Sequence, residues 1–397
     1  MINNVVILSG VRTAIGDFGG SLKDVSPASL GEIVIREAVA RAGISPGDVE
    51  HVVLGQVIPT KPQDAYTARV SALQAGIPDS AAALTVNRLC GSGLQAIISA
   101  AQMIALGEAR FVVAGGTENM SQAPHYLTAG RFGQKMGAIK MLDALTATLS
   151  DPIEDYHMGV TAENIADRHQ ISRGTQDALA VESHRRASQA LTEGRFQDQI
   201  VPVEVKTRGG SIVFQTDEHV RTDVSVETLA KLKPAFAKEG SVTAGNASGI
   251  NDGAAAVVLC SAQDAEAGSL PVRARILSWA HAGVAPDVMG LGPVKAVPIA
   301  LARAGLPLDA IDIIESNEAF AAQACAVAQE LGFDPNKTNV NGSGIALGHP
   351  IGATGAILTV KLLAELERSG GRYGLVTMCI GGGQGIAMVI ERVGEAA

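Results

Sequence analysis

The sequence predicts an α/β protein made of two similar halves, with a mostly parallel sheet covered by helices. Short apolar runs that suit buried strands alternate with longer stretches of helical periodicity, which is typical of such sheets. The pattern also recurs at a shift of 262 positions, where Ala40–Gly43 falls on Ala302–Gly305 and the pair at 92–93 falls on the pair at 354–355. Because this spacing holds over more than fifty residues, it indicates an internal duplication. The chain of 397 residues is also long enough for more than one core.

The first half opens with a predicted buried strand from Val5 to Ser9. Ser26 is placed as an N-cap with Pro27 at the first helical position, and Gly43 is placed to end the helix that follows. The same alternation predicts the remaining elements of this half, which are strands at 52–54, 84–88 and 111–114 and a helix at 94–106.

The second half repeats these elements after a segment of different texture. Its last strand, Leu375 to Ile380, is predicted to match the strand at 111–114, with four extra residues in the second copy. The intervening segment carries helical stretches near 161–170 and 173–193 and a polar strand-turn region around 201–214. We therefore predict three parts, namely a first half of residues 1–119 plus 250–270, an inserted domain of residues 120–249 and a second half of residues 271–397.

Composition argues against several classes of protein. A net charge of −9 and an aromatic content of 3% oppose nucleic-acid binding. The four cysteines form no C-x-x-C pair and have no histidine at zinc-finger spacing, so we expect reduced thiols and no metal. Two uncharged windows, 338–360 and 373–390, each hold five glycines and do not read as membrane spans. Because no basic region precedes the first strand and no cleavage signal follows it, we expect a cytoplasmic protein.

The stretch from Asn87 to Leu94 places Cys90 between an apolar run and a helix-like run, with two glycines beside the thiol. A thiol at a helix N-terminus is favoured as the reactive thiolate, because the helix dipole and free N–H groups stabilise negative charge. A buried cysteine that only packs is the alternative. Gly91–Ala96 also fits the dinucleotide fingerprint G-x-G-x-x-A. Its late position in the chain and the lack of an acidic residue about twenty residues on argue against a nicotinamide oxidoreductase.

Two further glycine-rich stretches carry ionisable side chains. Asn341–Gly352 contains His349 as its one ionisable residue, which suits a base. Cys379 lies at the end of a predicted strand and is followed by three glycines, whose N–H groups could bind an oxyanion. Two thiols, one histidine and amide pockets suit thioester chemistry, with one thiol as nucleophile and the other as acid and base. We expect Cys260 and Cys325, which lie in apolar surroundings, to be core residues.

Four segments together resemble the signature blocks of the thiolase family, in the family's order and spacing. They are Asn87–Gly93, Asn317–Phe320, Gly348–Gly352 and Cys379–Gly383. The resemblance covers essentially the whole chain and includes residues 11–13 and 157–164. It implies a layered αβαβα fold of two duplicated βαβ-type halves, with an inserted loop domain that binds coenzyme A.

The resemblance also implies residue roles. Cys90 would carry the acyl group, His349 would activate it, and Cys379 would move the proton at the α-carbon of acetyl-CoA. Asn317 would hold a water that joins His349 in one oxyanion site, and the N–H groups of Cys90 and Gly381 would form the other. The residues implied for the coenzyme A and acyl site are Leu149, His157, Met158, Arg221, Ala244, Gly245, Ser248, Met289, Ala319 and Phe320.

The activity implied is that of an acetyl-CoA C-acyltransferase, which exchanges acetyl-CoA and an acyl-CoA with 3-ketoacyl-CoA and coenzyme A. Coenzyme A is then substrate and product, and no other cofactor, nucleic acid or membrane partner is expected. A degradative enzyme for longer 3-ketoacyl-CoA substrates and a non-catalytic acyl-CoA-binding protein are the alternatives. A ketoacyl-carrier-protein synthase is disfavoured, because the third catalytic position looks like Cys379. Residues 126–142, with Phe132 and Met136 among basic residues, resemble a tetramerisation loop, so we expect a homotetramer built from dimers.

Overall fold

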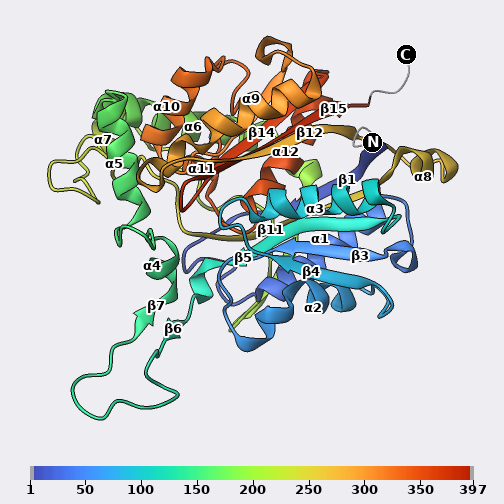
Figure 1. The fold of residues 1–397 in the computed structure, drawn as a ribbon, viewed down its shortest axis with the longest axis horizontal. Helices are drawn as coiled ribbons and strands as arrows, with labels where there is room; N and C mark the ends of the chain where they lie inside the picture. Colours follow the sequence, from blue (N-terminus) through green and yellow to red (C-terminus); the bar gives the residue numbers. More distant parts are fainter. Residues whose placement is uncertain (1–3, 394–397) are drawn as a thin grey trace.

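The computed structural model describes residues 4–393, and within these residues the chain forms one large mixed sheet covered by helices (Figure 1). The order of its main strands is β13-β14-β15-β12-β1-β11-β5-β3-β4. The strands on this path are β1 (Val5–Thr13), β3 (His51–Gly55), β4 (Ala82–Val86), β5 (Val112–Asn119), β11 (Asn251–Ser261), β12 (Ala274–Gly283), β13 (Ile313–Ser316), β14 (Tyr373–Ile380) and β15 (Gln384–Arg392). The short strands β2 (Gly16–Asp17) and β8 (Ile200–Val201) pair with β11 and β1.

The sheet reads the same from its centre outwards in both directions. From the pair β1–β12, the order is β1-β11-β5-β3 on one side and β12-β15-β14-β13 on the other. His51 pairs with Val112 in the first half, and Ile313 pairs with Gly374 in the second, so both partners are shifted by 262 positions. The predicted duplication is therefore confirmed. The prediction of four extra residues in the second copy is wrong, because the paired strands β3 and β5 are related to β13 and β14 by the same shift of 262 positions.

The prediction of a mostly parallel sheet is also wrong. Parallel pairing joins β3 to β4 and β5, and β13 to β14, whereas β1, β11, β12 and β15 pair antiparallel with their main neighbours. The alternation of strands and helices reports only the parallel part of each half. The antiparallel strands are buried on both faces and read as uniform apolar runs, which carry no information about direction.

The two halves of the sheet and three sets of helices form five layers. Helices α3 (Ser92–Leu106) and α12 (Thr354–Ser369) pack against each other; α3 contacts strands of the first half of the sheet, and α12 contacts strands of both halves. Helices α1 (Pro27–Arg41) and α2 (Thr67–Gln74) cover the first half, and α9 (Gly292–Ala304) covers the second. The expected αβαβα layering is confirmed. The stretch 89–106 is long and apolar enough to cross a membrane by composition alone, but 56% of it is buried, as in the core helix of a folded domain.

Local signals place several helix ends as the sequence predicts. The Ser26 hydroxyl accepts a hydrogen bond from the Ser29 N–H ahead of α1, and Pro27 is the first helical residue. Gly43 follows the helix with a left-handed φ of 71°. Strand β5 extends beyond its apolar run, however, because Gly115 and Gly116 continue it. A Cβ atom at Gly116 would lie 2.1 Å from the Gly352 carbonyl oxygen, so this strand carries glycine where a loop of the other half packs on it.

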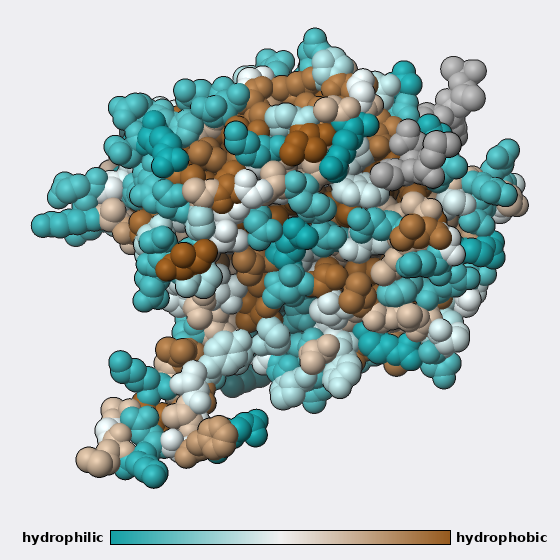
Figure 2. All heavy atoms as spheres, in the orientation of Figure 1, coloured by the Kyte–Doolittle hydropathy of each residue, from teal (hydrophilic) through white to brown (hydrophobic). Residues whose placement is uncertain are grey.

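The chain between β5 and β11 leaves the sheet and forms a separate helical region. Its elements are β6 (His125–Tyr126), β7 (Leu142–Asp143), α4 (Ala144–Thr148), α5 (Met158–Arg168), α6 (Arg173–Thr192), β9 (Val203–Thr207), β10 (Gly210–Phe214) and α7 (Val226–Leu229). The loop between β6 and β7 projects from the body (Figure 1), and its surface mixes hydrophobic and hydrophilic residues (Figure 2). The remaining helices are α8 (Ala262–Ala267), α10 (Ala321–Leu331) and α11 (Gly344–Leu347).

Candidate active site

A small apolar cavity of ≈ 60 Å³ lies where the start of α3, the end of β14, the loop before α12 and the start of α5 meet. The two thiols and the histidine singled out from the sequence all face it. Its lining residues are Leu89, Cys90, Thr148, Leu149, His157, Met158, Ser248, Met289, Ala319, Phe320, His349, Ile351, Cys379 and Gly381. Eleven of the fifteen predicted site residues are in this lining.

The other four predicted residues lie elsewhere. Asn317 is buried beside His349. Arg221, Ala244 and Gly245 belong to the inserted region and do not line the cavity. Arg221 is exposed, and its backbone N–H donates to His184 Nδ1 over 3.2 Å. Any contact of these three with a ligand therefore falls outside the cavity that holds the thiols.

The loop that presents Cys90 is held in a tight conformation. Leu89 has a left-handed φ of 45°, which is uncommon for a side chain of its size. Its N–H donates to the Asn87 side-chain oxygen over 2.9 Å, and its carbonyl accepts the Ser92 hydroxyl over 2.7 Å. A Cβ atom at Gly91 would lie 2.6 Å from the Ile380 side chain. Glycine at this position lets the end of β14 pack directly on the start of α3, and a larger residue would push the Ile380 side chain aside.

The electrostatics of Cys90 differ from the sequence-based expectation of a stabilised thiolate. Burial raises the pKa of the thiol to about 11, and the charge of Glu118 raises it further. Hydrogen bonds from the backbone N–H groups of Gly381 and of Cys90 itself lower the pKa, but by less. Cys90 precedes the N-cap Gly91, and the helix begins at Ser92. The prediction of a thiolate is wrong because desolvation outweighs the amide groups, so this thiol needs a base to become a nucleophile.

His349 is positioned to be that base. Its Nδ1 lies 2.6 Å from the Thr354 hydroxyl, and its backbone N–H donates to Asn251 Oδ1 over 2.9 Å. Its Nε2 lies 3.4 Å from Asn317 Nδ2. Burial lowers the pKa of the imidazole to about 4, so the ring is neutral at pH 7 and can accept a proton.

The second thiol sits where β14 meets a glycine turn. Cys379 is buried, and burial raises the pKa of its thiol; the nearby charge of Cys90 raises it further. The turn that follows needs glycine, since Gly382 and Gly383 have φ values of 79° and 87°. This turn lets β15 return antiparallel and directs the Gly381 N–H at the Cys90 sulfur. One strand end thus supplies both a thiol and an amide donor.

Backbone packing holds these loops together. The Gly352 carbonyl oxygen would lie within 3.1 Å of Cβ atoms placed at Gly55, Gly93 or Gly116. Glycine at these positions therefore allows α3 and the His349 loop to approach closely. In a dinucleotide site the corresponding glycine would face a pyrophosphate. Here Gly93 packs on protein backbone, so the alternative of a nicotinamide oxidoreductase does not hold.

Sequence reasoning missed several residues of this region. Leu89, Thr148 and Ile351 line the cavity, and Phe236 stacks on the His157 ring with centroids 4.6 Å apart and planes at 15°. Phe236 also meets Phe320 edge-on at 6.0 Å. The available signal was a phenylalanine in the polar stretch around 230–240 of a chain that has only eight.

Another missed residue is Glu118, whose buried carboxylate accepts N–H groups from Val57, Ile58 and Gly352. Burial raises the pKa of this carboxyl to about 8, and the three N–H groups lower it by less. The signal for it was an acidic residue four positions after the apolar run that ends at Ala114. The carboxylate joins the His349 loop to β5.

The other two cysteines lie away from the cavity. Cys260 is buried in β11, and Cys325 is half-buried in α10 against a neighbouring apolar cluster. Burial raises the pKa of Cys260 to about 12 and that of Cys325 to about 11. Both pack against apolar residues and neither lines the cavity, in line with the core positions that the sequence predicts.

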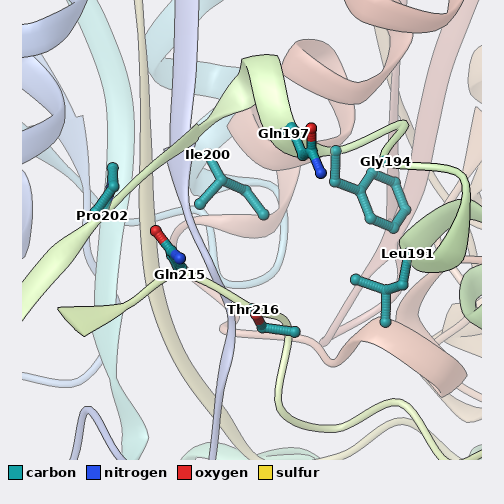
Figure 3. A pocket seen from close by; sticks show the side chains of 8 residues that line it. Leu191, Gly194, Gln197, Ile200, Pro202, Gln215 and Thr216 are labelled. Atoms are coloured by element: carbon teal, nitrogen blue, oxygen red, sulfur yellow. The ribbon is translucent and has the colours of Figure 1, made fainter. Parts of the chain in front are cut away.

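A larger cavity of ≈ 370 Å³ lies apart from this site, between α6 and the strands that follow it (Figure 3). Leu191, Ile200, Pro202 and Gln215 are among its lining residues. Its lining contains no charged side chain, thiol or histidine, so it offers none of the reactive groups that line the smaller cavity.

Comparisons with known proteins agree with this geometry. Models of the thiolase N-terminal and C-terminal domains match residues 5–263 and 270–392. Beta-ketothiolase BktB of Cupriavidus necator is 59% identical over 394 residues, which cover 99% of this chain and 100% of that protein. Acetyl-CoA acetyltransferase of Pseudomonas aeruginosa is 50% identical, with 98% and 100% covered.

Solved structures show the same fold. The crystal structure of Bacillus anthracis acetyl-CoA acetyltransferase has a TM-score of 0.97 at 48% identity and covers 98% of this chain and 99% of its own. The structure of human mitochondrial 3-ketoacyl-CoA thiolase in complex with CoA has a TM-score of 0.96 at 44% identity, with 99% of both chains covered.

The fold and the cavity define a layered α/β enzyme with two thiols and a histidine at one buried site. The chain belongs to the thiolase family, since both family models match and the similarity extends over its full length. The family expected from the four sequence motifs is confirmed.

Proposed function

We propose that this protein is an acetyl-CoA C-acyltransferase that catalyses reversible condensation and thiolysis. In the condensing direction, acetyl-CoA and an acyl-CoA give 3-ketoacyl-CoA and coenzyme A through an acyl group on Cys90. The observation that carries the proposal is the convergence of Cys90, His349 and Cys379 on one apolar cavity in a thiolase-family fold. A non-catalytic acyl-CoA-binding protein would have no need of all three.

The first half-reaction transfers the acyl group to Cys90. The neutral imidazole of His349 accepts the thiol proton, which is required because the pKa of Cys90 is raised to about 11. The sulfur then attacks the thioester carbon, and coenzyme A leaves as a thiolate. His349 returns the proton to that thiolate, so acyl-Cys90 and neutral coenzyme A remain.

The second half-reaction forms the carbon–carbon bond. His349 accepts the thiol proton of Cys379, the Cys379 thiolate takes a proton from the α-carbon of acetyl-CoA, and the carbanion attacks the acyl carbon on Cys90. The Cys90 thiolate is released and takes its proton from the His349 imidazolium, so both thiols and the imidazole end neutral. Because burial raises the pKa of the Cys379 thiol, this thiol also needs a base before it can take the α-proton.

Two donor sets would stabilise the oxyanions of these steps. The Gly381 N–H already points at the Cys90 sulfur, which supports an oxyanion site formed with the Cys90 N–H. Asn317 lies 3.4 Å from His349, and its buried side-chain oxygen has no hydrogen-bond partner among residues 4–393. This supports its role in holding a water for the second oxyanion site.

Coenzyme A enters and leaves through the inserted region in this proposal. Leu149, His157, Met158, Ser248, Met289, Ala319 and Phe320 would contact the acyl group and the adjoining part of the ligand. Arg221, Ala244 and Gly245 would contact a more distant part, since they do not line the cavity. Support comes from the structural relative solved in complex with CoA. The proposal needs no cofactor, because coenzyme A is substrate and product, and thiols and an imidazole supply the whole of the proposed proton chemistry.

A short acyl chain is the better-supported substrate. The cavity beside the sulfur is only ≈ 60 Å³ and is lined by large apolar side chains such as Met289 and Phe320. A degradative enzyme for longer chains is the second candidate, favoured by the likeness to a human 3-ketoacyl-CoA thiolase. Steady-state rates across acyl lengths in both directions separate the two.

The test of the function is the covalent intermediate. We expect protein mixed with acetyl-CoA and quenched in acid to carry an acetyl group on the Cys90 peptide, identified by mass after digestion. An acetyl group mainly on Cys379, or on no thiol, would contradict the proposal.

The assembly is proposed from the projecting loop between β6 and β7. Phe132 and Met136 are 94% and 87% exposed there, beside Lys135, so this loop offers apolar side chains with nothing to cover them in one chain. We expect a cytoplasmic homotetramer built from dimers, with the loop as a contact between them. Light scattering that shows only monomer at micromolar concentration would contradict this assembly.

The division of the chain into three parts also stays a proposal. Strand β5 ends at Asn119 and its neighbour β11 begins at Asn251, which supports an insert close to residues 120–249. The insert returns to the sheet at β8, which pairs with Arg12 and Thr13 of β1.

A further inference from the structure

The imidazole of His349 has two ring nitrogens, and only an unprotonated Nε2 can take the proton of Cys90. The ring contacts a hydroxyl through its other nitrogen, since Nδ1 lies 2.6 Å from Thr354 Oγ1. Both residues are buried, so no bulk water competes for this contact. The direction of this one hydrogen bond decides which tautomer the ring adopts.

The hydroxyl of Thr354 is already committed as a donor. Oγ1 lies 2.9 Å from the Pro350 carbonyl oxygen, four residues earlier, and a carbonyl can only accept. Thr359, also buried in α12, makes the same bond to the Gly355 carbonyl over 2.8 Å. A hydroxyl has one hydrogen, so Thr354 must accept from His349. Nδ1 is therefore the protonated nitrogen.

The other side of the ring fits the same tautomer. Nε2 faces Asn317 Nδ2 at 3.4 Å, and an amide nitrogen donates. With Nδ1 protonated, Nε2 offers its lone pair to this donor.

We propose that Thr354 is a positioning residue that holds His349 as the Nδ1–H tautomer, with Nε2 free as the base for Cys90. The inference rests on the proposed function, in which His349 activates this thiol. When the proton moves from the Cys90 sulfur to Nε2, the S–H bond breaks and an N–H bond forms. The imidazolium keeps its Nδ1–H bond to Thr354, so the ring need not turn during the transfer.

The same contact serves the return of the proton. The new Nε2–H can be given to the departing coenzyme A thiolate while Nδ1 stays bonded to Thr354. Without the hydroxyl, the Nδ1–H would be buried with no acceptor, and the ring would gain by shifting the proton to Nε2. In that tautomer Nε2 cannot accept a proton from Cys90.

The experiment compares Thr354→Val with Thr354→Ser and Thr359→Val. Valine has nearly the shape of threonine but no hydroxyl, and serine keeps the hydroxyl. Thr359→Val is the matched control, because it removes the same bond to a carbonyl from the same helix without touching His349. The readouts are the single-turnover rate at which acetyl-CoA acetylates Cys90, and kcat and KM for acetyl-CoA.

We expect Thr354→Val to lower the acetylation rate and kcat by roughly 10-fold to 100-fold, the usual loss when the partner that orients a histidine is removed. KM should stay near the wild-type value. Thr354→Ser should recover most of the rate, and Thr359→Val should match the wild type. A wild-type rate in Thr354→Val, or an equal loss in Thr359→Val, would overturn the proposal.

A second measurement needs no substitution at Thr354, and so does not depend on how that variant folds. Solid-state ¹⁵N NMR of histidine-labelled protein, with the His349 signals identified by their loss in His349→Asn, should show Nδ1 protonated at pH 7. A protonated Nε2 would overturn the inference. Failure of the wild-type protein to become acetylated on Cys90 would instead overturn the proposed function, so the two failures are distinguishable.

Discussion

The starts of α3 and α12 are the same place in the two halves of the molecule, yet they carry different chemistry. At a shift of 262 positions, Cys90 corresponds to Gly352 and Ser92 to Thr354, where the two helices begin. The first half presents a thiol just before its helix. The second half has a glycine there, whose carbonyl packs against the first half, and its histidine stands three residues earlier.

The ends of β5 and β14 also match, and here it is the second half that carries the thiol. Cys379 corresponds to Thr117, which is buried and donates to the Pro27 carbonyl. The second half therefore places a reactive group at its strand end and the first half places one at its helix start. Because both positions face one cavity, the difference teaches that a duplicated frame need not carry duplicated chemistry: each half supplies a thiol that the other half lacks at the matching position.

The largest expected effect comes from removing the reactive group of the first half. Cys90→Ala should lose both acetylation and condensation, because no other thiol in the cavity can carry the acyl group while Cys379 handles the α-proton. Mass analysis after acid quench and a condensation assay measure the two activities. Acetylation of Cys379 in this variant would contradict the prediction, because it would show that either thiol can carry the acyl group.

Removing the thiol of the second half should separate acetylation of Cys90 from condensation. Cys379→Ala should still become acetylated on Cys90, while condensation falls by roughly 100-fold to 10,000-fold, the usual contribution of a general acid or base. Single-turnover acetylation and steady-state condensation are the measurements. Condensation near the wild-type rate in the folded variant would make Cys379 a structural thiol.

The pH dependence of alkylation tests whether the start of α3 stabilises an anion. With the pKa of Cys90 raised to about 11, the thiolate fraction should rise about tenfold per pH unit between pH 7 and 10. His349, with a pKa of about 4, stays neutral throughout this range and adds no slope. Iodoacetamide labelling of the Cys90 peptide in substrate-free protein, followed by mass, should show no plateau. A plateau below pH 8 would restore the thiolate predicted from the sequence.

The smallest expected effect concerns the packing of the Gly352 loop of the second half against the first half. In Gly352→Ala a Cβ atom would lie 2.5 Å from the Glu118 carboxylate and 3.0 Å from the Gln56 Cα, so we expect a loss of about 1–3 kcal/mol of stability. Gly47→Ala is the control, since its Cβ would meet only the Ser45 hydroxyl at 3.7 Å. Denaturant unfolding compares the two. Equal midpoints for both variants would mean that the halves are not packed as closely as described.

The sequence by itself determined the duplicated frame and the candidate chemistry. Apolar runs, the Ser26-Pro27 cap and Gly43 are local signals whose effect acts over a few residues, so elements such as α1 could be predicted with correct ends. The repeat at a shift of 262 positions predicted two similar halves, and four motifs indicated the family. The loop residues Cys90, His349 and Cys379 stood out because each is a reactive side chain among glycines.

Only the tertiary structure decided the direction of the strands, the state of the thiol and the membership of the cavity. Strand direction depends on which distant run a strand meets, as with β1 and β11, and a buried apolar run looks the same either way. The pKa of Cys90 depends on burial by residues from both halves, which outweighs the local amide groups that the sequence displays. Whether a residue lines the cavity also depends on how distant segments pack. Leu89 lines the cavity and Arg221 does not. Desolvation and close packing are set by contacts between segments hundreds of residues apart, and no local pattern records them.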